Sequence, residues 1–409
     1  MQQAMVSRSL TDWLANAGLR NMSFEEMVEG FGRHLNEAGV RVDRMFVGMN
    51  TLHPMVRARS VIWDRASPAL TRFEFSHSEI DAPTVRDSPF APMLQDGVAE
   101  RRCDLTDLAT VRGVPVFEEL HAGGMTEWLG CIFPMGELVP QIDWAAEAEH
   151  AERLALVCSL TTGQPGGYSE ADMAVLKPAL PVFAVAVKAV SMRTIGHGLL
   201  AAYLGDDPAA RVFAGTVQRG EVQGVEAVLF YTDLRGFTAI ADTTPGKELI
   251  ALLDECFECM VEPIVRHGGE VLKFMGDGLL AAFAVRPAGR AEVCAAALDA
   301  ATEALALIEA LNARRRAAGQ RTAGLDLSLH IGGVQYGNVG TAARLDFTVI
   351  GPAVNEASRI EKLCEPLGQS LLVSQAFAEA ATASRGRLVS LGRHKLRGVR
   401  EETELFGLA

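Results

Sequence analysis

The stretch "EAVLFYTDLRGFT", residues 226–238, determines the fold that we expect for the second half of the chain. Residues 227–231 are apolar and contain neither Gly nor Pro, which predicts a buried strand. Asp233 follows where the strand should still be buried, and an unpaired carboxylate in apolar surroundings is costly. The sequence therefore predicts that a positive group lies beside Asp233.

A second aspartate stands in "RHGGEVLKFMGDGLLAAF", residues 266–283. This pattern predicts two strands joined by a Gly-Asp-Gly turn at 276–278, with Asp277 at the turn. A helix is expected before them, because apolar residues recur there at helical spacing. Its apolar stripe comprises Leu249, Leu252, Leu253, Cys256, Phe257 and Met260.

The two aspartates converge if Asp277 lies beside the strand that contains Asp233. Two neighbouring carboxylates repel each other unless a cation sits between them. Hard oxygen ligands with open coordination positions favour Mg²⁺ or Mn²⁺. The alternative is that each Asp only ends a strand or caps a turn.

The segment "LRGFT" adds a feature that suits an anion. Gly236 permits a tight backbone turn, and Thr238 is expected to be the N-cap of a helix. Free backbone N–H groups at a helix start bind anions. A divalent cation beside such amides describes a nucleoside triphosphate site, and the alternative is an ordinary strand-to-helix turn.

A third segment, "DFTVIGPAVNEASRIEKLCE" at 346–365, predicts a strand followed by a helix from Pro352. Asn355 and Arg359 are four residues apart and therefore share one helical face. An Arg in that position suits a phosphorus centre that gains negative charge during reaction. The alternative is a solvated face on which Arg359 pairs with a carboxylate such as Glu356.

The final segment, "HKLRGVREETELFGL" at 394–408, predicts a hairpin with Arg397 just before Gly398. Arg397 could hold terminal phosphates or could be a surface Arg. Its spacing alone leaves both interpretations open.

The first half of the chain predicts a separate α+β unit. Residues 23–38 are helical in pattern, and Ser23 with Glu26 forms a capping box. A long helix at 168–193 is expected to begin after Ser169 and to kink at its two internal prolines. The strand-like runs between these helices are 42–50, 57–63, 127–136 and 152–162.

Composition limits the class of protein. The 409 residues are 49% hydrophobic with a net charge of −13 and no long basic run, which excludes nucleic-acid binding through a bulk basic surface. We expect that no apolar run reaches the length of a membrane span and that there is no secretory signal, and therefore a cytoplasmic protein. Seven scattered cysteines, an odd number, predict reduced thiols.

The second half resembles the catalytic domain of class III nucleotidyl cyclases, which carries five motifs in the order found here. These are "FYTDLRGFT", "HGGEVLKFMGDGLLAAF", "YGNVG", "FTVIGPAVNEASR" and "LRG". The resemblance implies a ferredoxin-like α+β fold at 223–409 that acts as an antiparallel homodimer with shared active sites. Residues 1–193 resemble a GAF-type or PAS-type sensory domain, and residues 194–222 are expected to be a linker.

The resemblance also implies roles for individual residues. Asp233 and Asp277 would hold two divalent metals, Mg²⁺ or Mn²⁺, in each active site, with help from the Leu234 carbonyl. One metal would activate the ribose 3′-hydroxyl, and the other would hold the triphosphate. The backbone amides implied in phosphate binding are those of Gly236, Phe237 and Thr238.

Other residues would act from the partner protomer. The resemblance implies that Lys273 and Thr348 contact the base, and that Asn355 orients the ribose. Arg359 would stabilise the transition state, and Arg397 would bind the β- and γ-phosphates.

The base-contacting pair favours ATP. A Lys donates to adenine N1, whereas guanine carries a proton there and needs an acceptor such as Glu. Thr348 stands where many relatives have Asp, which places the chain in the Lys/Thr subgroup of the family. The predicted function is an adenylate cyclase that converts ATP to 3′,5′-cyclic AMP and pyrophosphate. The N-terminal unit would regulate it in response to a small molecule or a protein. The alternatives are a guanylate cyclase and a non-catalytic nucleotide-binding dimer.

Overall fold

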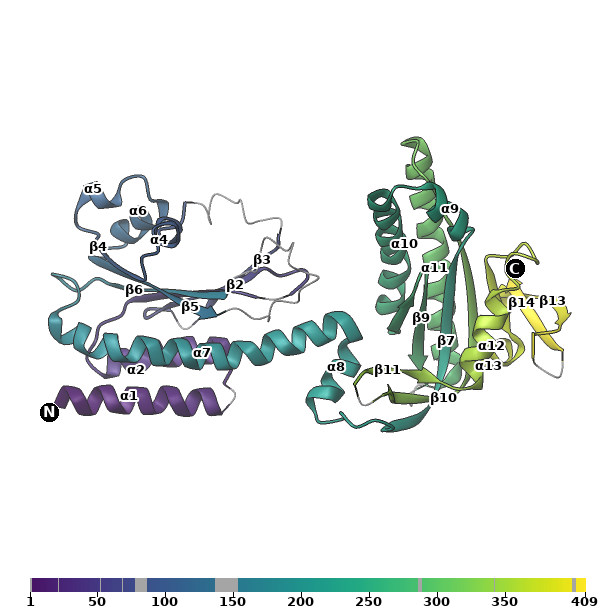
Figure 1. Cartoon of the computed structure of the whole chain (residues 1–409), viewed down its shortest axis with the longest axis horizontal. Coiled ribbons are helices and arrows are strands. Elements are labelled where there is room, and N and C mark those ends of the chain that lie inside the picture. The colour runs from purple at the N-terminus through teal and green to yellow at the C-terminus, as the bar shows by residue number, and fades with distance from the viewer. Residues whose placement is uncertain are drawn as a thin grey trace. The chain divides into compact units, whose positions relative to one another are not determined.

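A computed structural model describes residues 2–20, 22–51, 53–67, 69–77, 87–136, 154–285, 289–341, 343–398 and 402–409. The chain forms two compact units, Met1–Ala202 and Tyr203–Ala409. Each unit combines helices with its own sheet (Figure 1), so the α+β class predicted for both halves is confirmed.

The first unit is built on a six-stranded sheet in the order β3-β2-β1-β6-β5-β4, with every neighbouring pair antiparallel. Its strands are β1 (Arg44–Asn50), β2 (Ala58–Asp64), β3 (Thr71–Phe75), β4 (Glu100–Asp104), β5 (Glu127–Gly136) and β6 (Leu154–Thr162). The strands predicted from the sequence are therefore present. The resemblance of this unit to a GAF-type or PAS-type domain stays a prediction.

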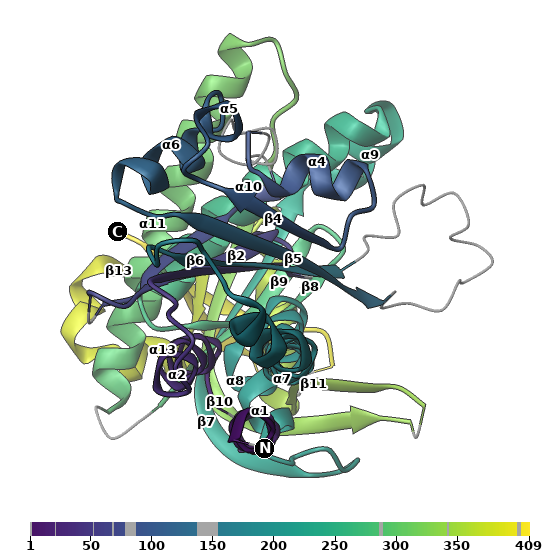
Figure 2. The ribbon, with the colours of Figure 1, turned by 90° about the vertical axis from the view of Figure 1, so that its left-hand side faces the viewer.

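Helices cover both faces of this sheet (Figure 2). One face carries α1 (Gln2–Leu19), α2 (Phe24–Glu37) and α7 (Glu170–Leu204), and the other carries α4 (Phe90–Gln95), α5 (Leu108–Val111) and α6 (Pro115–Ala122). The predicted capping box of α2 is confirmed, because the Ser23 hydroxyl accepts from the Glu26 amide while the Glu26 carboxylate accepts from the Ser23 amide.

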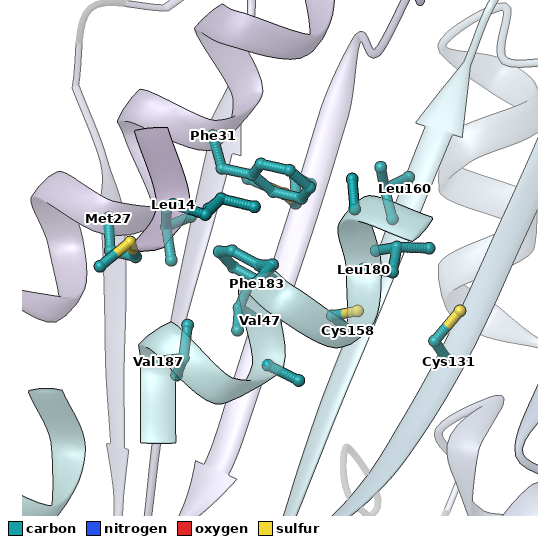
Figure 3. Close-up of a cluster of buried hydrophobic side chains, with 14 of the residues drawn as sticks. Leu14, Met27, Phe31, Val47, Cys131, Cys158, Leu160, Leu180, Phe183 and Val187 are labelled. Carbon is teal, nitrogen blue, oxygen red and sulfur yellow. The ribbon is translucent and has the colours of Figure 1, made fainter. Parts of the chain in front are cut away.

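The core beneath α7 is apolar and tightly packed (Figure 3). Phe31 of α2 and Phe183 of α7 stack with ring centroids 4.3 Å apart. Cys131 and Cys158 lie opposite each other on β5 and β6, and all seven cysteines are free thiols. Burial of this core holds α7 against the sheet.

The long helix α7 differs from the prediction in two respects. It begins after Ser169 as expected, with the Ser169 hydroxyl accepting from the Asp172 amide, but it continues to Leu204 rather than ending at residue 193. It contains an 18-residue window of mean hydropathy 1.7, of which 56% is buried. By length and composition alone this helix could cross a membrane, so the expectation that no apolar run reaches that length is wrong. Its buried residues also belong to the core of the first unit, as in the core helix of a folded domain.

The second unit contains an eight-stranded sheet in the order β13-β14-β12-β10-β7-β9-β8, with β11 paired to β10. The strands are β7 (Val222–Arg235), β8 (Glu270–Met275), β9 (Gly278–Ala284), β10 (Gly324–Gly340), β11 (Leu345–Ile350), β12 (Leu371–Ser374), β13 (Leu388–His394) and β14 (Thr403–Leu408). The predicted hairpins at 276–278 and around Arg397 are both present. The central strand β7 pairs with β9 on one side and with β10 on the other.

The helices of the second unit pack on this sheet through separate apolar clusters. The helices are α9 (Phe237–Thr243), α10 (Gly246–Arg266), α11 (Arg290–Ala317), α12 (Pro352–Glu361), α13 (Gln375–Ala380) and a 3₁₀ helix (Thr382–Arg387). Helices α10 and α11 share one cluster with residues such as Phe230 of β7. Helix α12 packs against the opposite face with Leu229 of β7.

The predicted linker at 194–222 is helical over much of its length. Its first part belongs to α7, and α8 (Asp206–Phe213) follows. Helix α8 is attached to the second unit, because the Tyr336 hydroxyl of β10 donates to the Asp207 carboxylate over 3.0 Å. The Arg211 guanidinium also lies over the Tyr336 ring, 5.3 Å from its centroid. These two contacts with Tyr336 therefore fix a segment that the sequence predicted only as a linker.

Candidate active site

The two predicted aspartates meet at one end of β7. Asp233 lies in β7 itself, and Asp277 lies in the turn between β8 and β9. Their carboxyl groups lie close enough to interact. Burial of Asp233 and the nearby Asp277 charge raise the pKa of Asp233 to about 6. The sequence predicted a positive neighbour for Asp233, but the side chain that contacts it is another acid.

The Gly-Asp-Gly turn makes this approach possible. Gly276 has a φ of 71°, a conformation that favours glycine. A Cβ atom at Gly278 would lie 2.0 Å from the Thr232 carbonyl oxygen and 3.1 Å from Asp233 Oδ1. Glycine at this position therefore lets β9 pass close enough to β7 to place Asp277 beside Asp233.

Two further acids, which the sequence analysis missed, surround this pair. Asp326 of β10 is the register partner of Asp233, and it is buried. Glu361 at the end of α12 is also buried. Burial, followed by the charges of Asp233 and Asp326, raises the pKa of Glu361 to about 7. The available signal for Asp326 was a single carboxylate in the apolar run "LDLSLHI".

The strand-to-helix turn after β7 differs in detail from the prediction. Gly236 itself is the N-cap of α9, with a φ of 72°, and its carbonyl accepts from the amides of Ala239 and Ile240. Thr238 lies inside the helix and is exposed, so its prediction as the N-cap is wrong. The left-handed conformation of Gly236 starts the helix two residues earlier than a Thr cap would.

A second group of predicted residues lines an open hollow of about 500 Å³. Asn355 and Arg359 share its wall with Gly398, the residue after Arg397. A Cβ atom at Gly398 would lie 3.5 Å from an Arg359 guanidinium nitrogen, so the β13–β14 turn packs against this Arg. The remaining lining residues are Gly351, Pro352 and Glu356.

Glu356 is directed toward a buried histidine. Its carboxylate lies 3.5 Å from Nε2 of His330, and Nδ1 of His330 lies 2.9 Å from the Ser374 hydroxyl. Burial lowers the pKa of His330. This geometry accounts for Glu356 without the pairing to Arg359 that the sequence left open.

The two residues predicted to contact the base lie on neighbouring strands. Lys273 is exposed on β8, Thr348 is buried on β11, and these two strands approach each other. The Thr348 hydroxyl oxygen has no hydrogen-bond partner among the described residues. Neither residue lines the 500 Å³ hollow, and neither do Asp233 and Asp277. The predicted site residues therefore form separate groups within one protomer.

The carboxylate pair fits a divalent cation. Asp233 and Asp277 offer only oxygen donors, as Mg²⁺ and Mn²⁺ prefer, and their mutual repulsion would be relieved by a bound cation. In the described parts of the chain, no group of three or more His, Cys, Asp or Glu is arranged to hold a metal. Other groups, such as substrate oxygens and water, would have to complete the coordination.

The second unit also matches a known protein family. Residues 221–409 match the family described as "Adenylate and Guanylate cyclase catalytic domain". Residues 221–409 are a class III cyclase domain. The match begins within two residues of the boundary that the motifs predicted, and it includes every predicted site residue.

Curated relatives of the cyclase domain include two adenylate cyclases. Adenylate cyclase 1 of Rhizobium meliloti (strain 1021) is 30% identical over 190 residues, which are 42% of this chain and 28% of the relative. Adenylate cyclase of Anabaena cylindrica is 29% identical over 163 residues, which are 39% of this chain and 31% of the relative. The chain thus matches about three-tenths of the length of these relatives.

Solved structures of both kinds of cyclase also match. The adenylyl cyclase CyaB from P. aeruginosa is 24% identical, with 46% of this chain and 96% of that chain covered and a TM-score of 0.41. The guanylyl cyclase Cya2 is 25% identical, with 46% and 93% covered and a TM-score of 0.41. The matches thus include both adenylyl and guanylyl cyclases.

Proposed function

We propose that the cyclase domain converts ATP to 3′,5′-cyclic AMP and pyrophosphate as a homodimer, under the control of the N-terminal unit. The observation that carries this proposal is the convergence of Asp233 and Asp277 at the end of the central strand. Two carboxylates in contact are unfavourable in an empty site and favourable when they hold a cation. The domain family and the adenylate cyclase relatives support the reaction class.

Asp233 and Asp277 would hold two Mg²⁺ or Mn²⁺ ions, with the Leu234 carbonyl as a further ligand. When bound, these ions lower the pKa of the ribose 3′-hydroxyl and neutralise the triphosphate. The amides of Gly236, Phe237 and Thr238 would bind phosphate oxygens at the start of α9.

The hollow beside α12 would receive the sugar and phosphates. Asn355 would orient the ribose, and Arg359 would stabilise the negative charge that develops on the α-phosphate. Arg397, which is exposed in the β13–β14 turn, would bind the terminal phosphates. The packing of Gly398 against Arg359 supports joint action of the turn and the helix.

Lys273 and Thr348 would recognise adenine. The exposed Lys273 ammonium can donate to adenine N1. The Thr348 hydroxyl, which has no hydrogen-bond partner in the described part of the chain, can accept from the adenine amino group. The separation of the carboxylate pair from the Asn355 hollow supports two half-sites that are completed by a second protomer.

Product analysis of the purified chain tests the proposal. Cyclic AMP should form from ATP with Mg²⁺ or Mn²⁺, and Asp233→Ala should abolish it. Cyclic GMP from GTP in preference to cyclic AMP would instead identify a guanylate cyclase. Formation of neither product, by the full chain or by residues 221–409 alone, would contradict catalysis.

A further inference from the structure

An ion pair close to Asp233 and Asp277 joins two neighbouring strands of the sheet. Arg235, the last residue of β7, contacts both carboxylate oxygens of Asp326 on β10. Its Nε lies 3.0 Å and 3.2 Å from these two oxygens. A third contact extends the arrangement, because Nη2 of Arg235 donates to the Gln369 carbonyl over 2.8 Å. A bidentate pair of this kind fixes the orientation of both side chains.

The strand register places this ion pair beside Asp233. Asp326 stands directly opposite Asp233 across the β7–β10 pair, and Arg235 is two residues beyond Asp233 on the same strand. Side chains at these positions lie on one face of an antiparallel sheet. Asp233, Arg235 and Asp326 therefore form a charged triangle on the face that also approaches Asp277.

The charges of these three residues determine which carboxylates are available to bind a cation. Asp326 is 5% exposed, so its charge is not screened by water. Without the Arg235 guanidinium, Asp326 would be a third unpaired carboxylate next to a cation held by Asp233.

We propose that Arg235 is a positioning residue that occupies Asp326, so that Asp233 and Asp277 hold the catalytic cation without competition from it. This inference rests on the proposed function. In this proposal Arg235 acts on Asp326, and through Asp326 on Asp233, and does not act on the substrate. Removing the Asp326 charge should then weaken cation binding, whereas removing the Arg235 charge should strengthen it.

The test is Mn²⁺ binding to the full chain without nucleotide, measured by loss of the free-ion electron paramagnetic resonance signal. Asp326→Asn leaves an unpaired positive charge and should weaken Mn²⁺ binding by about tenfold, the order expected for one unit charge near the site. Arg235→Gln leaves an unpaired negative charge and should tighten it by a similar factor. The double variant restores the charge balance and should bind almost as wild type does.

Turnover provides the second measurement. Arg235→Gln should lower cyclase kcat although it binds Mn²⁺ more tightly, because Asp326 then competes for the cation. Arg290→Gln is a matched control, since Arg290 makes a bidentate pair with Glu226 near the opposite end of β7. This control should change neither Mn²⁺ binding nor kcat.

The outcomes separate this inference from the proposed function. Mn²⁺ binding that is lost in Asp233→Asn but unchanged in both ion-pair variants would overturn the positioning role alone. Weaker Mn²⁺ binding in Asp326→Asn, in Arg235→Gln and in the double variant, together with lower melting temperatures, would show that the ion pair is only structural. That result would also overturn the positioning role. No Mn²⁺ binding by the wild type would contradict the cation site itself.

Discussion

Gly278 of β9 lies directly against the Thr232 carbonyl of β7, where an added Cβ atom would approach to 2.0 Å. Backbone atoms cannot give way as a flexible side chain can, so only glycine fits without moving β9. This contact places Asp277 beside Asp233 and is therefore the structural basis of the candidate cation site.

Gly278→Ala should destabilise the cyclase domain by about 3 kcal/mol or more, because the clash is with the backbone of the central strand. Thermal unfolding of residues 221–409 would measure the change. Gly333→Ala is the control, since a Cβ atom at Gly333 would meet nothing within 4 Å. Equal melting temperatures for the two variants would show that the β7–β9 approach tolerates a side chain.

The acids around Asp233 make stability depend on pH. The pKa of Glu361 is raised by burial to about 7 in the folded protein, against 4.5 in the unfolded chain. A raised carboxyl pKa means that ionisation disfavours folding, so the penalty is absent below about pH 4.5 and complete above about pH 7. Glu361→Gln should therefore raise the melting temperature at pH 8 and change it little at pH 4.5. A stabilisation that is the same at both pH values would contradict a charge effect.

Helix α8 should open more often when the Tyr336 hydroxyl that binds it to β10 is removed. Tyr336→Phe keeps the ring over which Arg211 lies but removes the hydroxyl that bonds to Asp207 at 3.0 Å and to Glu270 at 3.4 Å. We expect backbone amide exchange in residues 206–213 to become about fivefold faster, equivalent to a hydrogen bond of about 1 kcal/mol. Tyr203→Phe, at an exposed position, is the control. Unchanged exchange in Tyr336→Phe would mean that other contacts hold α8.

Lys273 should control the choice of base without affecting the fold. It is exposed on β8, so Lys273→Glu should change the free energy of unfolding by no more than about 0.5 kcal/mol. Turnover of ATP should fall at least tenfold, because Glu cannot donate to adenine N1. Lys247→Glu makes the same charge change at an exposed position on α10 and should leave ATP turnover unaffected. If both variants turn ATP over like the wild type, the base assignment is wrong.

Local signals in the sequence predicted much of the fold. The capping box at Ser23 and Glu26, the glycine turn at 276–278 and the start of α12 at Pro352 each depend on residues only a few positions apart. Each of these signals can be recognised within a few consecutive residues. They located both aspartates of the candidate site as well as Asn355 and Arg359.

Features that depend on distant residues were missed. The position of Asp326 opposite Asp233 follows from the register of β7 against β10, which no short window contains. Helix α8 is fixed by Tyr336, more than a hundred residues away, so its Gly-rich surroundings indicated only a connector. The residue types predict Thr238 as the helix cap, because the left-handed conformation of Gly236 is not encoded by residue type alone.

The measurement that tests the central claim most directly is a mixing experiment with two inactive variants. Asp233→Ala lacks a cation ligand and Arg359→Ala lacks the guanidinium of the hollow, so each homodimer should form no cyclic AMP from ATP. If the active site is shared between protomers, mixing the two variants creates heterodimers in which one site has every group, and part of the cyclic AMP formation should return. No recovery, when subunit exchange has been demonstrated and the wild type is active under the same conditions, would contradict the shared site.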